Sequence, residues 1–167
     1  MPTLISRDEA LARIREECGV PRCLMCAIRD GRAGKTVLVA DEDEVMLVLP
    51  RYVRRWGHAM AMPKPHVTSF VEVGDVLWER TNAMALRAAR MIERTRRPRR
   101  CYLASTGSSA GELTQTSVHL HIHVIPLHEP DDKPSDIFSW SGGVWVADDR
   151  EWEELRLSYV EAYRQTH

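Results

Sequence analysis

The sequence lacks any long apolar run, and its first residues do not form an apolar segment. No uninterrupted hydrophobic stretch approaches the roughly 20 residues that cross a bilayer. Residues 1–19 carry charges throughout, which excludes the hydrophobic centre of a secretory signal. We therefore expect a cytoplasmic protein that does not act at a membrane.

An excess of charge of one sign is also missing. Lys and Arg number 23 against 24 Asp and Glu, so the net charge is -1 at pH 7. A chain so close to neutral has no overall attraction to a nucleic-acid backbone, which disfavours a polynucleotide partner. Repeats and low-complexity tracts are absent, and 167 residues with 44% hydrophobic content suffice for one core. We expect one domain over residues 1–167.

Cysteine is scarce, with four residues, of which Cys23 and Cys26 form a C-x-x-C pair. In a reducing compartment such a pair indicates metal or redox chemistry more often than a structural disulfide. Cys18 and Cys101 stand apart from this pair and are expected to be ordinary thiols.

The remaining pattern predicts an α+β fold with a mainly antiparallel sheet of about five strands, covered by helices on one face. Short β-branched runs on either side of the charged DEDE tetrad predict a hairpin. Apolar residues at helical spacing predict one long amphipathic helix and a shorter helix near each end. The expected order is helix 7–18, hairpin strands 36–40 and 45–49, strand 58–63, helix 75–96, strands 101–105 and 118–126, and a C-terminal helix within 148–165.

Three histidines at every second position are the strongest chemical signal in the chain. In a strand, His119, His121 and His123 project from one face, roughly 7 Å apart, while the apolar residues between them project from the other. Burying three imidazoles without partners costs on the order of 1 to 3 kcal/mol each, so packing alone is a poor explanation for the row.

Two chemistries use such a row. Zinc can be bound by two or three imidazoles with one open coordination position, or a neutral imidazole can attack phosphorus while its neighbours bind the phosphoryl oxygens. Gln115, Thr116 and Ser117 lie just before the row and offer an amide and two hydroxyls to phosphate or leaving-group oxygens. This loop favours the phosphate-facing interpretation.

The run QTSVHLHIHVIP resembles the signature of the histidine-triad (HIT) superfamily. WGHAMAMPKPHVTSF looks like the family's glycine-histidine strand and proline-lysine-x-histidine turn, and CLMCAI looks like its N-terminal C-x-x-C. The likeness runs in the same order over residues 23–126. Residues 127–167 form a C-terminal extension, in which Trp140, Trp145 and Trp152 are expected to pack into the core. A dimer contact and a wall of the substrate pocket are the alternatives for these tryptophans.

The resemblance implies roles for individual residues. The middle histidine of the family motif forms a nucleotidyl intermediate, so His121 is the implied nucleophile. The last histidine lies near the α-phosphate, which implies that role for His123. Gln115 is implied to contact the phosphate or the leaving group. Thr116 is implied to bind phosphate, and Ser117 offers a further hydroxyl.

In zinc-bearing members of the family, the two cysteines, the histidine of the turn and the first triad histidine hold a metal ion. The matching residues here are Cys23, Cys26, His66 and His119. Two thiolates and two imidazoles complete a closed tetrahedral site, which is typical of structural rather than catalytic zinc.

The expected function is hydrolysis or nucleotidyl transfer at the α-phosphate of a nucleoside polyphosphate, dinucleoside polyphosphate or nucleoside phosphoramidate. A nucleotide-binding protein with little catalysis and a zinc hydrolase with an open metal site are the alternatives. The resemblance also implies a homodimer. The sequence departs from the family pattern at Pro50, near the position where many members carry an Asn or Asp that binds the ribose hydroxyls.

Overall fold

A five-stranded antiparallel sheet organises the fold. The structure is a computed structural model that describes residues 1–18, 23–32, 37–107 and 118–166. Neighbouring strands of the sheet follow the order β2 (Val37–Glu42), β3 (Val45–Leu49), β4 (Ala59–Pro63), β6 (Ile122–Leu127) and β5 (Arg100–Ala104). Strand β6 therefore lies between β4 and β5, to which it is antiparallel.

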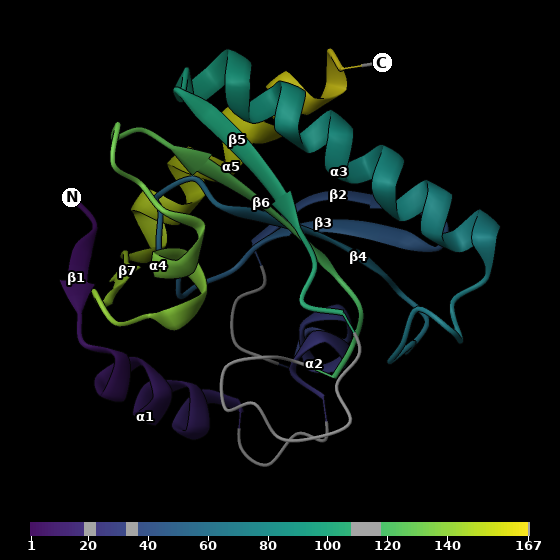
Figure 1. Cartoon of the computed structure of the whole chain (residues 1–167), viewed down its shortest axis with the longest axis horizontal. Coiled ribbons are helices and arrows are strands. Elements are labelled where there is room, and N and C mark those ends of the chain that lie inside the picture. The colour runs from purple at the N-terminus through teal and green to yellow at the C-terminus, as the bar shows by residue number, and fades with distance from the viewer. Residues whose placement is uncertain (19–22, 33–36, 108–117, 167) are drawn as a thin grey trace.

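Helices cover both faces of this sheet (Figure 1). Because side chains alternate along a strand, Leu47 and Ala61 face α3 (Asp75–Arg96) and α5 (Asp149–Arg164), whereas Met46 and Met60 face α2 (Leu24–Arg29). The prediction that helices cover one face only was wrong, since α2 packs on the opposite face from α3 and α5.

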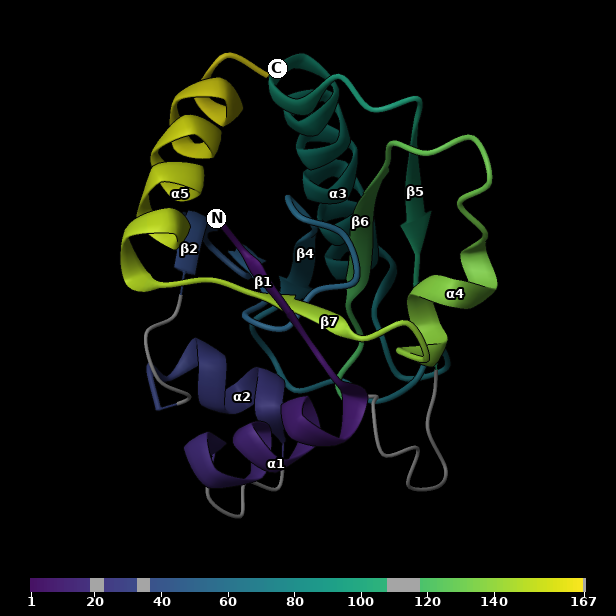
Figure 2. The ribbon, with the colours of Figure 1, turned by 90° about the vertical axis from the view of Figure 1, so that its left-hand side faces the viewer.

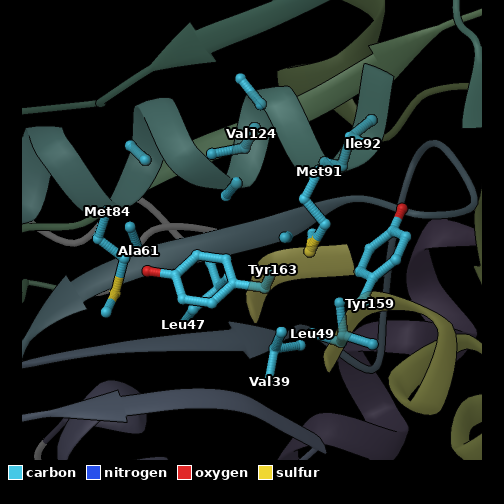
Figure 3. Close-up of a cluster of buried hydrophobic side chains, with 14 of the residues drawn as sticks. Val39, Leu47, Leu49, Ala61, Met84, Met91, Ile92, Val124, Tyr159 and Tyr163 are labelled. Carbon is cyan, nitrogen blue, oxygen red and sulfur yellow. The ribbon is translucent and has the colours of Figure 1, made fainter. Parts of the chain in front are cut away.

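The main core lies between the sheet, α3 and α5. Figure 3 shows Met84, Met91 and Ile92 of α3 and the two tyrosines Tyr159 and Tyr163 of α5 over the strands. The apolar stripe of α5 predicted from the sequence is confirmed, and Asp148 caps this helix in a capping box with Glu151. The C-terminal extension thus contributes to the same core as the sheet.

A second, two-stranded sheet joins the N-terminal segment to the C-terminal extension. Strand β1 (Thr3–Ile5) pairs antiparallel with β7 (Val144–Val146), and both lie beside α1 (Arg7–Cys18) in Figure 2. The short helix α4 (Pro134–Ser139) precedes β7. Trp140 and Trp145 are half-buried against hydrophobic clusters and Trp152 is buried, as expected for core packing.

Most of the longer predicted elements are confirmed: helices 7–18 and 75–96 have the expected bounds, and the hairpin around DEDE is present as β2 and β3. The histidine row differs from the prediction. Strand β6 begins only at Ile122, so His119 and His121 precede it. The backbone NH of Leu120 instead donates to the carbonyl of Val67, 2.8 Å away, outside the sheet. No described helix combines the length and apolar composition that crossing a membrane requires.

Candidate active site and metal site

Four side chains from three distant segments gather at one end of the sheet. Cys23 and Cys26 flank the start of α2, His66 follows β4, and His119 precedes β6. Their ligand atoms all lie within 4.8 Å of one another, so this group could hold a metal ion. The structure thus brings together the four residues that the resemblance implies as ligands.

The spacing of these atoms fits tetrahedral zinc. Zn–S bonds of about 2.3 Å and Zn–N bonds of about 2.0–2.1 Å place sulfur and nitrogen roughly 3.6 Å apart at a tetrahedral angle. Nδ1 of His119 lies 3.7 Å from Sγ of Cys23 and 3.6 Å from Sγ of Cys26. Nδ1 of His66 lies 3.3 Å from Sγ of Cys26.

The protonation of His119 also suits a metal ligand. Its Nε2 lies 2.8 Å from the carbonyl oxygen of Pro63, and because a carbonyl only accepts, Nε2 carries the hydrogen. In the neutral ring, Nδ1 then has the lone pair and faces the two sulfurs. A backbone carbonyl that accepts from the other ring nitrogen and so orients a histidine ligand is common at protein zinc sites. Burial raises the pKa of the Cys26 thiol, and a bound cation would reverse that shift by favouring the thiolate.

The other two histidines of the row belong to a separate chain of imidazoles. Nε2 of His121 lies 3.0 Å from Nε2 of His123, and Nδ1 of His123 lies 3.0 Å from Nε2 of His58. His58 immediately precedes β4, and His123 is paired with Met60 of that strand, which explains why the two rings meet. His58 and His121 are buried, with 7% and 4% of their surface exposed.

Hydrogen bonding fixes the tautomers along this chain. Nδ1 of His121 lies 2.7 Å from the carbonyl oxygen of His119 and must donate to it, so Nε2 of neutral His121 is an acceptor. His123 then donates from Nε2 and accepts at Nδ1, and His58 donates from Nε2. Nδ1 of His58 is left unprotonated, which agrees with its being buried without a hydrogen-bond partner in the structure.

Burial keeps all three rings neutral. Desolvation lowers the pKa of His58 to about 3 and lowers the pKa values of His121 and His123 as well. The carbonyl of His119 acts in the opposite direction on His121 and favours its charged form. The site therefore presents His121 as a neutral imidazole with a lone pair on Nε2. The carbonyl of His119, which accepts from Nδ1, is placed to stabilise positive charge on this ring.

A glycine turn positions His58. Gly57 has φ of +93°, a conformation that glycine adopts without strain, and a Cβ at this position would lie 2.6 Å from the hydroxyl oxygen of Tyr159. That hydroxyl donates to the carbonyl of Gly57 over 2.7 Å and is buried. Helix α5 thus fixes the backbone next to the last imidazole of the chain.

From the sequence, His58 is expected to take no part in the chemistry, as are His128 and His167. The position of His58 in the glycine-histidine segment was the available signal, but the contact with His123 depends on the pairing of β4 with β6, which is not local in sequence. Gln115, Thr116 and Ser117, the predicted phosphate and leaving-group contacts, lie outside the described residues.

Comparisons with known proteins find solved structures of the same fold. A zinc-bound histidine triad family protein from Mycobacterium smegmatis is 22% identical, with a TM-score of 0.65 over 86% of this chain and 94% of its own. A hypothetical histidine triad nucleotide-binding protein from Sulfolobus tokodaii is 22% identical, with a TM-score of 0.68 over 86% of this chain and 93% of its own.

A Hit-like protein involved in cell-cycle regulation from Bartonella henselae is 17% identical, with a TM-score of 0.68 over 84% of this chain and 95% of its own. At these identities the likeness shows a shared fold. The comparison with curated proteins found no match. The family model of the HIT domain matches residues 32–130, more than half of the sequence, and the chain therefore belongs to the HIT domain family.

Proposed function

We propose that this protein is a nucleotide hydrolase or nucleotidyltransferase that acts at an α-phosphate through a nucleotidyl intermediate on His121. The substrate classes are nucleoside polyphosphates, dinucleoside polyphosphates and nucleoside phosphoramidates. One observation carries the proposal: His121 is neutral, donates from Nδ1 to a backbone carbonyl, and holds its Nε2 lone pair toward a second imidazole. Membership of the HIT domain family supports a nucleotide substrate.

In the first step, the lone pair of His121 Nε2 forms a bond to the α-phosphorus. The bond from phosphorus to the bridging oxygen or nitrogen of the leaving group breaks, and its electron pair leaves with that atom. His123 loses its acceptor when Nε2 of His121 becomes bonded, so its Nε2 hydrogen turns to a phosphoryl oxygen or to the leaving atom and donates a hydrogen bond to it, while a leaving amine takes its proton from water. The carbonyl of His119 stabilises the positive charge that develops on the His121 ring.

In the second step, water or another acceptor attacks the same phosphorus. The bond from phosphorus to Nε2 breaks and its electron pair returns to His121, which is neutral again. The attacking oxygen releases its proton to water, which balances the proton that the leaving group took up in the first step. Gln115 and Thr116 are proposed to bind phosphate or leaving-group oxygens during both steps, with Ser117 as a further donor.

The metal site is proposed to be structural. Cys23, Cys26, His66 and His119 would hold one zinc ion in a closed tetrahedral shell, and when bound the ion would link α2 to the ends of β4 and β6. This assignment leaves His121 and His123 outside the metal shell, which argues against the alternative of a zinc hydrolase that uses the row as an open site.

Kinetic measurements distinguish the proposed enzyme from the alternative, a nucleotide-binding protein with little catalysis. Turnover of adenosine phosphoramidates and dinucleoside polyphosphates should fall at least 1000-fold in His121→Asn, because asparagine keeps a donor to the carbonyl of His119 but has no nucleophile in place of Nε2. Equal turnover by this variant and the wild type would refute the mechanism. Tight mononucleotide binding with negligible wild-type turnover would instead support the binding role.

We also propose that the protein is a cytoplasmic homodimer. Strand β5 lies at one edge of the sheet and exposes Leu103, 45% of whose surface is accessible. An exposed sheet edge is a natural place for a second copy to pair. Sedimentation velocity should give twice the chain mass of 19.1 kDa, and a monomer mass at micromolar concentration would contradict the dimer.

A further inference from the structure

A cavity lies between the C-terminal end of α3 and the N-terminal half of α5, beside the N-terminal end of the chain (Figure 2). It has a volume of about 530 Å³, and its lining includes Trp56, Arg96 and Leu155. Trp56 and Leu155 pack into the core between the sheet, α3 and α5, whereas His123 shares a face of β6 with the residues that pack against α4. The cavity is therefore distinct from the chain of imidazoles.

The guanidinium of Arg96 is the group in this cavity that lacks a partner. Its Nε is buried without a hydrogen-bond partner, and within the described residues the side chain makes no hydrogen bond or ion pair. Arg96 lies over Gly57, because its Nε and Cγ are 3.3 and 3.5 Å from the position that a Cβ of this glycine would take. Buried donors are nearly always bonded in folded proteins, so this one indicates an acceptor that the chain itself does not supply.

Three carboxylates also line the cavity, and each of them has a partner. Asp148 accepts from the backbone NH of Glu151 over 2.8 Å. Glu151 pairs with the amino group of Met1, and Glu154 pairs with Arg150 at 2.9 Å. None of the three is therefore left to neutralise Arg96.

The charges of the lining favour a ligand with a single negative charge. The amino group of Met1, Arg96 and Arg150 balance the three carboxylates, so the formal charges cancel. A carboxylate brings one charge and can accept two parallel hydrogen bonds from a guanidinium. A phosphate monoester brings about 1.5 to 2 charges at pH 7 and would meet repulsion from the acidic side of the cavity. Trp56 and Leu155 offer an apolar surface to the rest of the ligand.

We infer that this cavity is a binding site for a small monocarboxylate with an apolar body. The carboxylate pairs with Arg96, and the apolar part packs against Trp56 and Leu155. The volume of about 530 Å³ lies within the range of roughly 300 to 1,000 Å³ that is typical of small-molecule sites. Binding here does not depend on the chemistry proposed at His121, because neither Arg96 nor Trp56 belongs to the chain of imidazoles.

Benzoate is the probe, and the NεH resonance of Arg96 in NMR spectra of the full chain reports where it binds. Benzoate should shift this resonance to saturation, with a Kd of about 1 to 10 mM for so small a ligand. In calorimetric titrations, Arg96→Gln should weaken binding roughly tenfold or more, because the charged hydrogen bonds are lost, and Arg96→Lys should weaken it less. Arg99→Gln is the matched control, because Arg99 is exposed just beyond α3 and does not line the cavity. This variant should bind benzoate as the wild type does.

Uncharged and phosphate probes complete the test. Benzyl alcohol keeps the ring without the charge and should bind roughly tenfold more weakly than benzoate. Equal binding of the two compounds, or equal binding of benzoate by Arg96→Gln and the wild type, refutes the role of Arg96. Tighter binding of inorganic phosphate than of benzoate refutes the ligand class. Displacement of benzoate by adenosine monophosphate refutes a site separate from His121, and no shift of the Arg96 resonance below about 50 mM benzoate refutes the site itself.

Discussion

The histidines of this protein expose different ring nitrogens because each meets a different hydrogen-bond acceptor. His119 donates to the carbonyl of Pro63 and presents Nδ1 to the cysteines, whereas His121 donates from Nδ1 and presents Nε2 to His123. The side chains are chemically identical, and the backbone carbonyl that each ring contacts decides which nitrogen keeps its lone pair. His58, at the other end of the chain of rings, donates from Nε2 to Nδ1 of His123.

His58 is expected to act as a positioning residue. His58→Leu removes the donor to Nδ1 of His123, which can then take the other tautomer and lose its hydrogen on Nε2. We expect kcat to fall about 10- to 100-fold with little change in KM. His58→Gln, whose amide can replace the Nε2 donor, should recover most of the activity in steady-state assays. Equal losses in the two variants, or none, would contradict this role.

Acid should destabilise the protein through the same residue. The pKa of His58 is about 3 in the folded protein and about 6.5 when exposed, so between these pH values the unfolded state binds the proton and the folded state does not. The stabilisation is complete above pH 6.5 and is lost as the pH falls, by at most about 1.4 kcal/mol per pH unit. Urea titrations give the free energy of unfolding at pH 6.5 and at pH 4.5. The loss of this free energy between the two pH values should be smaller in His58→Gln than in the wild type, and an equal loss in both would exclude His58 as the cause.

Among the elements, α2 is the one that we expect to depend most on a metal ion. It has six residues, and Cys23 serves as its N-cap, accepting from the backbone NH of Cys26. A helix this short gains little stability from its own hydrogen bonds. Contacts of Met25 with the sheet and a shared metal shell are therefore what is expected to hold it in place.

Loss of one thiolate should remove the metal. We expect about one zinc per chain in the wild type and nearly none in Cys26→Ser, measured by elemental analysis after dialysis. Cys101→Ser is the control, because Cys101 is half-buried in β5, away from the cluster. The chelated wild type should also melt at a lower temperature. A wild type without zinc, or a Cys101→Ser variant that loses it too, would contradict the site.

The C-terminal helix α5 is linked to the active site by one hydrogen bond. Tyr159→Phe removes the buried donor to the carbonyl of Gly57, next to His58. Leaving that carbonyl unsatisfied should lower the free energy of unfolding by about 1 to 3 kcal/mol in urea titrations. Tyr102→Phe on β5 is the matched control, because the half-buried Tyr102 makes no hydrogen bond through its hydroxyl within the described residues. Equal effects of the two changes would argue against the link.

For the molecule as a whole, the sequence was informative wherever a pattern was long and regular. The 22 residues of α3 have a clear helical period, and the charged tetrad between two β-rich runs located the hairpin. Short elements escaped prediction: α2 and α4 have six residues each and β1 and β7 three, too few for a period to be recognised.

The candidate site was also predicted only in part, because some of its contacts join segments that are distant in the sequence. Residue types and spacing identified the histidine row and the cysteine pair, but the expected straight ladder of three rings was wrong, because His119 turns toward the cysteines before β6 begins. His58 and Phe138 reach His123 only through pairing and packing between distant segments. Single-sequence patterns carry no information about such contacts.

In the proposed mechanism, Nε2 of His121 becomes covalently bonded to phosphorus. The most direct measurement is tandem mass spectrometry of the protein mixed with an adenosine phosphoramidate and quenched within milliseconds in neutral denaturant, which preserves a phosphorus-nitrogen bond. We expect a mass gain of one nucleotidyl group, which is a nucleoside monophosphate less one water, located on His121 and absent from His121→Asn. A nucleotidyl group on another residue, or rapid turnover with no covalent adduct and undiminished activity in His121→Asn, would contradict it.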